Sequence, residues 1–417
     1  MAQLSEDCFA FGGALCPVDK ALSLIEEKVQ PVVENERVAL SQACGRILAQ
    51  DLVAPFDLPP HANSAVDGYA LAFADLSAES ETVLPVTGLA AAGHPLARPF
   101  VPGEAIRIFT GAAMPEGADT VMMQEDCVVE RGFVRLKPGL RKGANRREAG
   151  EDVTRGTIAL CAGRRLLPAD LGLAAALGCR ELEVRRALRV ALLSNGDELF
   201  EPGTPLPAGA IYDSNRHLLK GLLRGLGAAV SDLGILPDRE AALREALLSA
   251  AGEHDLIVAS GGMSSGEEDH MKRAVESCGS LHFWRLAIKP GRPVAMGQVG
   301  SVPFLGLPGN PVAVAVTFIV LARPFLFRLA GALAPSPLVF RVRAAFSYRK
   351  KKGRREYLRG RLRGEGKGLL ADRYPVEGAG ILSSIVRSDG LLILDEATTA
   401  IDPGEEVDFL PFSEVLW

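Results

Sequence analysis

The alternation of apolar and polar positions is most regular between residues 188 and 333. Short apolar runs there alternate with stretches in which apolar residues recur at the spacing of a helix. The runs predict strands at 190–193, 229–236 and 256–259; the stretches predict helices at about 216–227 and 239–251, after Glu268 and from near Asn310. Strands that alternate with helices predict a doubly wound parallel sheet, and therefore an α/β domain.

The pattern changes on both sides of this region. Helical spacing at 17–29, 41–48 and 168–177 predicts a framing layer of helices. Prolines, glycines and β-branched runs indicate a β-rich domain, which includes a hairpin at 127–136, inserted into that layer. Near the C-terminus, runs at 339–345, 357–362, 381–386 and 391–394 predict short strands.

The chain is therefore predicted to be multi-domain, as its 417 residues also suggest. The predicted domains are a discontinuous helical framing layer at 1–50 and 140–185, a β-rich inserted domain at 51–139, a central doubly wound α/β domain at 186–333, and a C-terminal all-β domain at 334–417.

Composition narrows the possible partners and compartment. The net charge is −5, which gives no general attraction to nucleic acid or to an anionic membrane. The longest apolar run, 312–322, is shorter than the ~20 residues that span a bilayer, and it predicts a buried helix. Seven dispersed cysteines without a CxxC pair indicate neither a disulfide framework nor a zinc site. The first residues lack the pattern of a signal peptide, so we expect a cytoplasmic protein.

A glycine-rich loop follows the predicted strand at 256–259. Its sequence, SGGMSSGEED from Ser260 to Asp269, precedes a predicted helix, and such a loop presents backbone N–H groups to an oxyanion. The expected anion-binding positions are Ser260, Gly261, Gly262, Ser264 and Gly266. One glycine loop could also be a simple turn between a strand and a helix.

Two further loops strengthen the functional interpretation. The segment 284–293 ends with the cations Lys289 and Arg292 on a turn, and 306–311 contains Pro308 and Asn310. Three such loops within about sixty residues, carrying acids and cations together, favour an anionic ligand with a bound divalent cation. In doubly wound sheets, ligands bind at the carboxyl ends of the strands, where 194–198 and 260–269 also fall.

Seven ordered motifs give the chain a resemblance to a known family. They are NSAVDGYA (63–70), RIFTGAAMPEGADTVMMQED (107–126), SNGDEL (194–199), IYDSNRHLL (211–219), SGGMSSGEED (260–269), LAIKPGRP (286–293) and GLPGNPV (306–312). The match to this family spans nearly the whole chain. The sequence resembles the molybdopterin molybdenumtransferases, the enzymes of the last step of molybdenum cofactor synthesis, which also form the larger domain of gephyrin-like proteins.

The resemblance implies an elongated four-domain homodimer. In the family, molybdate is inserted into the dithiolene of adenylylated molybdopterin with Mg²⁺, and AMP is released. The positions that match Asp67 and Thr110 belong to the β-rich domain and reach the doubly wound domain of the other subunit. A shared active site follows from this arrangement. A molybdopterin adenylyltransferase is a candidate partner, because it makes the substrate.

The chemistry assigns roles to further residues. Molybdate and a nucleotide anhydride are both anions, so a site for the pair needs fixed cations, which Lys289, Arg292 and Arg359 could supply. Mg²⁺ prefers oxygen ligands, for which Glu198, Asp238 and Asp269 are candidates. We expect Asp67, Thr110, Glu198 and Asp269 to be catalytic, and Ser383 to contact molybdate. Arg285 and Arg292 stand where the family often has Lys, and Ala379 precedes the paired serines where a polar residue is usual.

Structural alternatives remain open for each residue. Glu198 and Asp238 could cap helices, Asp67 could form a turn, and the cations could be solvated turn charges. Two other functions also remain open: a non-catalytic scaffold on the same fold, and a molybdopterin adenylyltransferase. The sequence does not distinguish molybdate from tungstate, because both are tetrahedral dianions of similar size.

Overall fold

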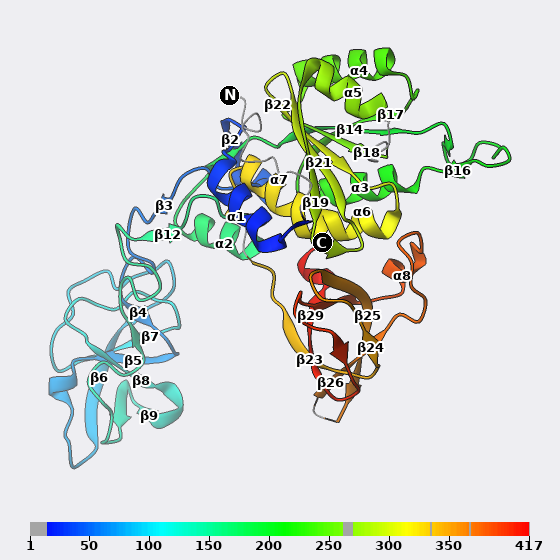
Figure 1. Ribbon diagram of the computed structural model, residues 1–417. Coiled ribbons are helices and arrows are strands. Elements are labelled where there is room, and N and C mark those ends of the chain that lie inside the picture. Colours follow the sequence, from blue (N-terminus) through cyan, green and yellow to red (C-terminus); the bar gives the residue numbers. More distant parts are fainter. Residues whose placement is uncertain (1–14, 262–269, 334–335, 367, 417) are drawn as a thin grey trace. The chain divides into compact units, whose positions relative to one another are not determined.

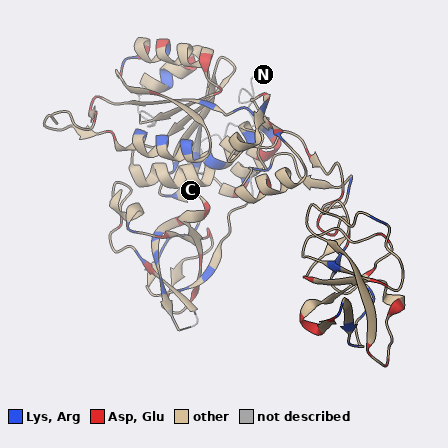
Figure 2. Ribbon diagram, turned by 180° about the vertical axis from the view of Figure 1, so that it is seen from behind, with Lys and Arg blue, Asp and Glu red and all other residues tan. Residues whose placement is uncertain are grey.

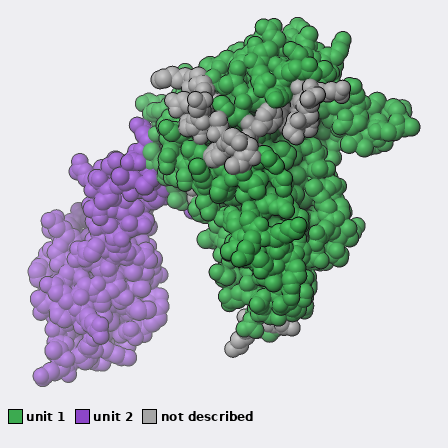
Figure 3. Space-filling view, viewed as in Figure 1, with its two compact units in different colours: residues 1–49, 162–166, 182–417 green, residues 50–161, 167–181 purple. Residues whose placement is uncertain are grey.

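The computed structural model describes residues 15–261, 270–333, 336–366 and 368–416 (Figure 1). By its internal contacts the chain divides into two compact units, which Figure 3 colours separately. Unit 1 comprises Met1–Ala49, Ala162–Leu166 and Leu182–Trp417, and unit 2 comprises Gln50–Cys161 and Leu167–Glu181. Acidic and basic residues are interspersed along the ribbon in both units (Figure 2).

Unit 1 is built on a seven-stranded sheet. Its strands, in spatial order, are β1 (Leu15–Cys16), β19 (Gly279–Leu286), β21 (Pro293–Val299), β22 (Val302–Leu307), β18 (Leu256–Ser260), β14 (Arg189–Asn195) and β17 (Ala229–Leu236). The four strands from β22 to β17 are parallel, whereas β21 runs antiparallel to both of its neighbours. The doubly wound α/β prediction is confirmed for the parallel strands, and the antiparallel strand makes the sheet mixed.

Helices cover both faces of this sheet because successive side chains of a strand point to opposite faces. In β14, Val190 and Leu192 join one hydrophobic core, while Ala191 and Leu193 join the other. The first core contains α1 (Val18–Lys28), α3 (Ser214–Gly225), α6 (Pro311–Thr317) and α7 (Arg323–Leu329). The second contains α4 (Glu240–Glu253) and α5 (His270–Cys278).

The helix after residue 310 is longer than its sequence predicts. It runs from Pro311 to Leu329 because a π-helical turn at Phe318–Ala322 joins α6 to α7, so Pro324 does not end it. By length and composition it is apolar enough to cross a membrane, but 78% of its most apolar window is buried inside the protein. It is therefore a core helix, as the sequence predicts.

The C-terminal part of unit 1 is a small closed β structure. Its sheet contains β25 (Arg355–Glu365), β26 (Gly368–Arg373), β23 (Phe340–Ala344), β29 (Glu406–Pro411) and β27 (Gly390–Leu394), and β25 also pairs with β27. The same part of the chain also forms a separate two-stranded sheet, β24 (Tyr348–Arg349) with β28 (Ala400–Ile401). One strand of this domain comes from elsewhere: β20 (Ile288–Lys289) runs parallel to β25, with Lys289 opposite Glu356. The central and C-terminal domains thus share a sheet.

Unit 2 is β-rich. Its six-stranded sheet has the order β8 (Thr120–Met123), β5 (Gly68–Leu71), β7 (Ala105–Ile108), β6 (Thr82–Ala90), β10 (Phe133–Leu136) and β9 (Cys127–Glu130). The hairpin predicted at 127–136 is formed by β9 and β10. The remaining elements are β3 (Leu52–Val53), β4 (Asn63–Ser64), β11 (Arg146–Arg147), β12 (Ile158–Leu160) and α2 (Pro168–Ala176). The predicted β-rich insertion and the C-terminal β domain are both confirmed.

Two predicted elements are wrong. No α-helix forms at 41–48: a single 3₁₀ turn covers Leu40–Gln42, and Ile47 and Leu48 form β-bridges instead. Residues 381–386 are not a strand but contain the short helix α8 (Ser383–Val386). Its turn is closed locally, because the Ser384 hydroxyl donates to the Ile381 carbonyl and Ile385 is buried in the core.

A buried ion-pair network ties the start of β14 to the start of β18. The side chain of Asp255 is only 7% exposed and accepts hydrogen bonds from Arg186 and Arg189. Burial raises the pKa of Asp255, but the bonds from both arginines outweigh burial and bring it to about 2. Unit 1 therefore depends on the ionised form of this carboxylate.

The short strands β2 (Asn35–Ala39) and β13 (Glu181–Arg185) form a separate pair, as do β15 (Leu199–Phe200) and β16 (Ile211–Tyr212). The β15–β16 pair begins directly after Glu198. The loop that carries this carboxylate is closed by a backbone bond from the Ile211 N–H to the Glu198 carbonyl, at 2.8 Å.

Candidate active site

Polar groups gather where β14 and β18 end. Ser194 pairs with Ser260 in register, and both side chains are almost completely buried. Their hydroxyl oxygens, and Oδ1 of Asn195, have no hydrogen-bond partner among the residues the structure describes. Buried polar groups are usually satisfied, so these atoms mark a place where a ligand is expected.

Gly261 follows directly, and only glycine fits at this position. Its φ is +91°, and an added Cβ would lie 2.7 Å from the Asn195 carbonyl oxygen. The strand ends are thus held close together at the start of the glycine loop. The predicted loop positions Gly262, Ser264 and Gly266 lie outside the described residues, and so does Asp269.

Two of the predicted metal ligands lie beside these strand ends. The Asp238 carboxylate accepts a hydrogen bond from Asn195 Nδ2 at 3.1 Å, and the Glu198 carboxylate folds back against Gly196. Neither acid caps a helix: Glu198 precedes a strand, and the N-cap of α4 is Arg239, without a side-chain bond. Within the described ranges, no group of three or more His, Cys, Asp or Glu residues forms a complete metal site.

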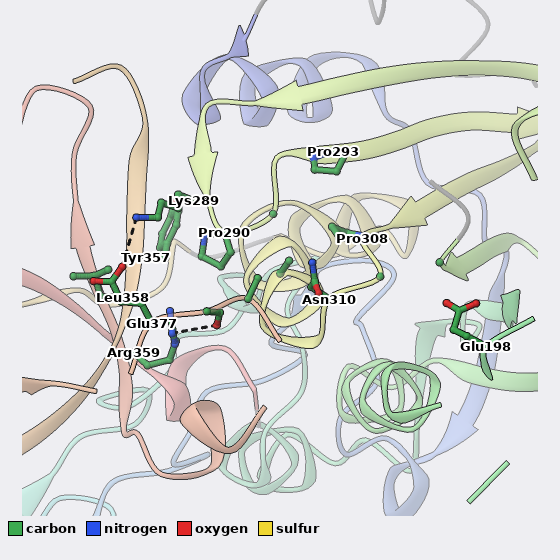
Figure 4. Close-up of a pocket in the computed structure, with 16 residues that line it drawn as sticks. Glu198, Lys289, Pro290, Pro293, Pro308, Asn310, Tyr357, Leu358, Arg359 and Glu377 are labelled. Carbon is green, nitrogen blue, oxygen red and sulfur yellow. Dashed lines mark hydrogen bonds and ion pairs between the residues drawn. The ribbon is translucent and has the colours of Figure 1, made fainter. Parts of the chain in front are cut away.

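A cavity of about 530 Å³ opens from the strand ends toward the C-terminal domain (Figure 4). Glu198 lies on one side, and Lys289 and Arg359 lie on the other; Gly261 also belongs to the lining. The intervening wall consists of Pro290, Gly291, Pro293, Pro308, Gly309, Asn310 and Ala313, with Tyr357, Leu358, Glu377, Gly378 and Ala379 from the C-terminal domain. The predicted loops at 289–293 and 306–311 therefore do converge on one cavity.

Arg359, on β25, is a buried cation in this wall. It is 6% exposed, its Nε donates to the Ser384 hydroxyl at 2.9 Å, and it forms no ion pair among the described residues. Burial lowers the pKa of Arg359, because removal from water disfavours the charged form. It is thus not a solvated charge. The charge of Glu377 in the same wall offsets the effect of burial only in part. A buried guanidinium that faces a cavity without a direct ion pair is suited to bind an anion.

Lys289 is also held in place. Its Nζ donates to the Tyr348 hydroxyl and to the Glu356 carboxylate, at 3.2 Å in each case, and Glu377 lies 3.9 Å away. Burial would lower the pKa of Lys289, but the bonds and charges of Tyr348 and Glu356 outweigh burial and raise it. The interpretation of this lysine as a freely solvated turn charge is wrong.

Two other predicted site residues, Arg292 and Ser383, are not placed in the described cavity wall. Gly291 and Pro293 line the cavity, but Arg292 between them is not among its described lining residues. Ser383 is exposed, whereas the neighbouring Ser384 is buried and contacts Arg359. Contacts of these two residues with a ligand stay predictions.

Sequence reasoning missed the residues behind the cavity wall. Glu356 and Tyr348 hold Lys289, and Glu377 lines the cavity while pairing with Arg373 at 2.7 Å. Nothing in the local sequence indicates them, since their role depends on β20 joining the C-terminal sheet. Acidic residues are mostly exposed in proteins, so Glu356 and Glu377 give no local sign of a role in the site.

In unit 2, the structure brings Asp67 and Thr110 together. Asp67 Oδ1 accepts bonds from both the backbone N–H and the hydroxyl of Thr110, each at 2.8 Å. These bonds lower the pKa of Asp67 and keep it ionised. Because its partner is far away in sequence, the interpretation of Asp67 as a local turn residue is wrong. Gly68 next to it packs so tightly that an added Cβ would lie 2.0 Å from the Met122 carbonyl oxygen.

The mixed α/β sheet has a cavity at the carboxyl ends of its strands, and Lys289 and the buried Arg359 line that cavity. This arrangement defines a protein of the class that binds ligands at such edges. Comparison with known proteins specifies the class. Three family models match: MoeA N-terminal region (domain I and II) at 16–178, probable molybdopterin binding domain at 191–328, and MoeA C-terminal region (domain IV) at 341–412. The chain belongs to the molybdopterin molybdenumtransferases, a family of transferases.

Individual relatives match over most of their length. A molybdopterin molybdenumtransferase of Haemophilus influenzae is 38% identical over 402 residues, covering 96% of this chain and 99% of that protein. Molybdopterin molybdenumtransferase 2 of Mycobacterium tuberculosis is 40% identical over 309 residues, covering 72% and 76%. A crystal structure of a molybdopterin biosynthesis moeA protein from Pyrococcus horikoshii OT3 has a TM-score of 0.82 at 29% identity, covering 95% of this chain and 100% of that one.

Proposed function

We propose that this protein inserts molybdate into adenylylated molybdopterin and releases AMP. The observation that carries the proposal is Arg359, a buried cation that forms no ion pair among the described residues and lies beside Lys289 in a cavity that extends to the sheet edge. An anion in that cavity would compensate the buried charge of Arg359, whereas Lys289 already pairs with Glu356. The nucleotide would lie at the strand ends, where the hydroxyls of Ser194 and Ser260 have no described partner. Molybdate and the dithiolene would then meet between the two domains that share β20.

The test uses purified protein, adenylylated molybdopterin and Mg²⁺, with and without molybdate. We expect AMP release that depends on molybdate and molybdenum retained on the pterin. Formation of adenylylated pterin from ATP and molybdopterin would instead identify an adenylyltransferase. Binding of pterin without any turnover would identify a non-catalytic scaffold. Supplying molybdate and tungstate together, and measuring which metal is retained, determines the oxyanion.

We propose Mg²⁺ as the divalent cation at the strand ends. Mg²⁺ is commonly held by one or two carboxylates together with substrate phosphates and water. Glu198 and Asp238 supply two carboxylates at one sheet edge, and the unpartnered Asn195 Oδ1 lies beside them, so the described donors fit such an ion. When bound, the ion would offset the charge of the nucleotide. Asp269 is proposed as a further ligand from its sequence position alone.

We also propose a homodimer in which each active site is shared. Asp67 is an ionised carboxylate that accepts two hydrogen bonds from Thr110, and both residues belong to a different compact unit from the cavity. In the proposed dimer this pair serves the cavity of the partner subunit. The protein would act in the cytoplasm, whose reducing conditions suit the free thiols of all six described cysteines.

Subunit mixing tests the shared site. Asp67→Ala and Lys289→Ala should each be inactive as homodimers. After subunit exchange, a mixed dimer has one intact site and one doubly altered site, so activity should return to about a quarter of wild type by statistical mixing. No recovery despite demonstrated exchange would place both residues in one subunit's site.

A further inference from the structure

Lys289 is the centre of a three-residue cluster that we call the lysine triad: Lys289, Tyr348 and Glu356. Lys289 Nζ donates to both partners at 3.2 Å, and the Tyr348 hydroxyl donates to the same Glu356 oxygen at 2.8 Å. Lys289 is half-exposed and lines the cavity, whereas Tyr348 is 8% and Glu356 2% exposed and neither lines it. The ammonium therefore faces the ligand while its two partners lie behind it.

The backbone makes this arrangement rigid. Lys289 belongs to β20, which pairs in parallel with β25, and the register places Lys289 opposite Glu356. Tyr348 comes from β24, which is held by β28. Three different strands thus fix the position of one Nζ atom. A cation that needed only to attract an anion would not require a buried carboxylate and a buried phenol behind it.

The proposed reaction requires proton movement. If a neutral dithiol reacts with molybdate, two S–H bonds and one Mo–O bond break, two Mo–S bonds form, and one oxygen leaves as water. Molybdenum remains hexavalent and the charge is unchanged, so no oxidant or reductant is needed. Both thiol protons must reach the departing oxygen. A group that transfers a proton to this oxygen lowers the barrier, because free oxide or hydroxide is a poor leaving group.

The two cations of the cavity differ in this respect. An arginine keeps its proton at any ordinary pH, so Arg359 can bind and orient the dianion but cannot transfer a proton. A lysine ammonium can transfer one and be recharged. Glu356 and Tyr348 stabilise the charged form of Lys289 and so return it to the ammonium state after each transfer.

We propose, on the basis of the proposed function, that Lys289 is the general acid that protonates the departing molybdate oxygen, and that Tyr348 and Glu356 are the positioning residues that aim and recharge it. A thiol proton then replaces the one that Lys289 has given up, which completes the cycle without a net proton change. Lys289 is the catalytic residue, because it alone of the three faces the cavity.

The direction of the pH dependence follows from the neighbours of Lys289. The titratable groups next to it are Tyr348 on β24, Glu356 on β25 and Glu377 in the loop after β26. Two cations complete the surroundings: Arg373 on β26 pairs with Glu377 and lies over the Tyr348 ring, and Arg359 on β25 lines the same cavity. Tyr348 and Glu356 raise the pKa of Lys289. Removing either residue lowers the pKa of Lys289. As the pH rises, the variant should therefore lose its ammonium group, and with it its activity, at a lower pH than wild type does.

The primary variants are Lys289→Arg and Tyr348→Phe. Lys289→Arg keeps the charge but cannot transfer a proton, so we expect the KM for molybdate to stay within about threefold while kcat falls by roughly 10²–10⁴-fold. Tyr348→Phe should lower kcat about tenfold and move the alkaline limb of the kcat profile to lower pH. Glu356→Gln should act in the same direction. Tyr348→Phe remains informative if the buried glutamine impairs folding.

The rate of molybdenum appearance on the pterin is measured together with AMP release. Tyr212→Phe is the matched control, because this exposed hydroxyl donates to the Thr204 carbonyl at 2.8 Å and does not line the cavity, so its profile should equal wild type. Wild-type kcat in Lys289→Arg, or an unmoved alkaline limb in Tyr348→Phe, would overturn the inference while wild type remains active. Absence of molybdate-dependent turnover in wild type would instead refute the proposed function, and this inference with it.

Discussion

Replacing Arg359 with Met tests the assignment of the cavity to the oxyanion. Arginine carries five N–H donors, of which one bonds to Ser384 at 2.9 Å and a second lies 3.5 Å from the Gly378 carbonyl. At least three donors therefore remain for a ligand. Two hydrogen bonds to a charged oxygen contribute about 1.5–3 kcal/mol each, so the lower bound for both is roughly 3 kcal/mol. This corresponds to an approximately 10²-fold higher molybdate requirement.

The assay titrates molybdate and adenylylated molybdopterin separately. We expect the molybdate KM of Arg359→Met to rise by about 10²-fold while the dissociation constant of the pterin nucleotide changes little. Stability should stay equal or rise, because an unpaired buried charge is replaced by an apolar side chain of similar length. Ser384→Ala should show a smaller, roughly tenfold, effect, since it removes the orienting bond and keeps the charge.

The matched control lies on the same strand. Arg363 is half-exposed and pairs with Asp372 at 2.8 Å, so Arg363→Ala should leave both titrations unchanged. Equal weakening of molybdate and nucleotide in Arg359→Met would mean that this residue serves the nucleotide or the fold. A loss of thermal stability in that variant would contradict the interpretation of Arg359 as a functional charge held at a cost in stability.

Three further predictions concern stability and the metal. Asp255→Asn should destabilise the protein at neutral pH by about 3–5 kcal/mol. In wild type, roughly 2 kcal/mol of that contribution should be present above the pKa of the unfolded state, near 4, and should be lost as the pH falls toward about 2. Chemical denaturation measures this pH dependence, which the variant should lack. Gly68→Ala should destabilise unit 2 by more than about 1 kcal/mol, because the new Cβ would lie 2.0 Å from the Met122 carbonyl oxygen. Gly172→Ala, whose new Cβ has nothing within 4 Å, should stabilise unit 2 by about 0.5–1 kcal/mol. Calorimetry measures both changes in stability, and changes opposite in sign to these would contradict the packing argument. Glu198→Gln should lower molybdate-dependent AMP release by roughly 10²-fold and raise its Mg²⁺ requirement, and an unchanged Mg²⁺ titration would exclude this carboxylate as a ligand.

The sequence alone was sufficient for the elements whose pattern is long and periodic. The alternation at 188–333 predicts the parallel strands and their helices, because each strand is buried on both faces. In β14, for example, successive side chains pack into two separate hydrophobic cores. The sequence was insufficient where the apolar pattern is short. At 41–48 and 381–386 the backbone bonds are decided by partners elsewhere in the chain or by a local turn, which no short apolar run reveals.

The candidate site divides in the same way. Motifs identified Glu198, Gly261, Lys289 and Asn310, and the need for cations in an anion site suggested Arg359; all five line one cavity in the structure. The motifs were informative because glycine turns and charged residues at strand ends have local sequence patterns.

Only the tertiary structure decided which residues lie behind that cavity. Glu356 and Tyr348 meet Lys289 because β20 leaves the central domain and joins the C-terminal sheet, and Ser384 rather than Ser383 reaches Arg359 because α8 turns inward. Such contacts join residues that are 25 to 67 positions apart in sequence, and no local period records them. The charge state and the aim of the cavity cations are therefore properties of the folded chain, while their presence is a property of the sequence.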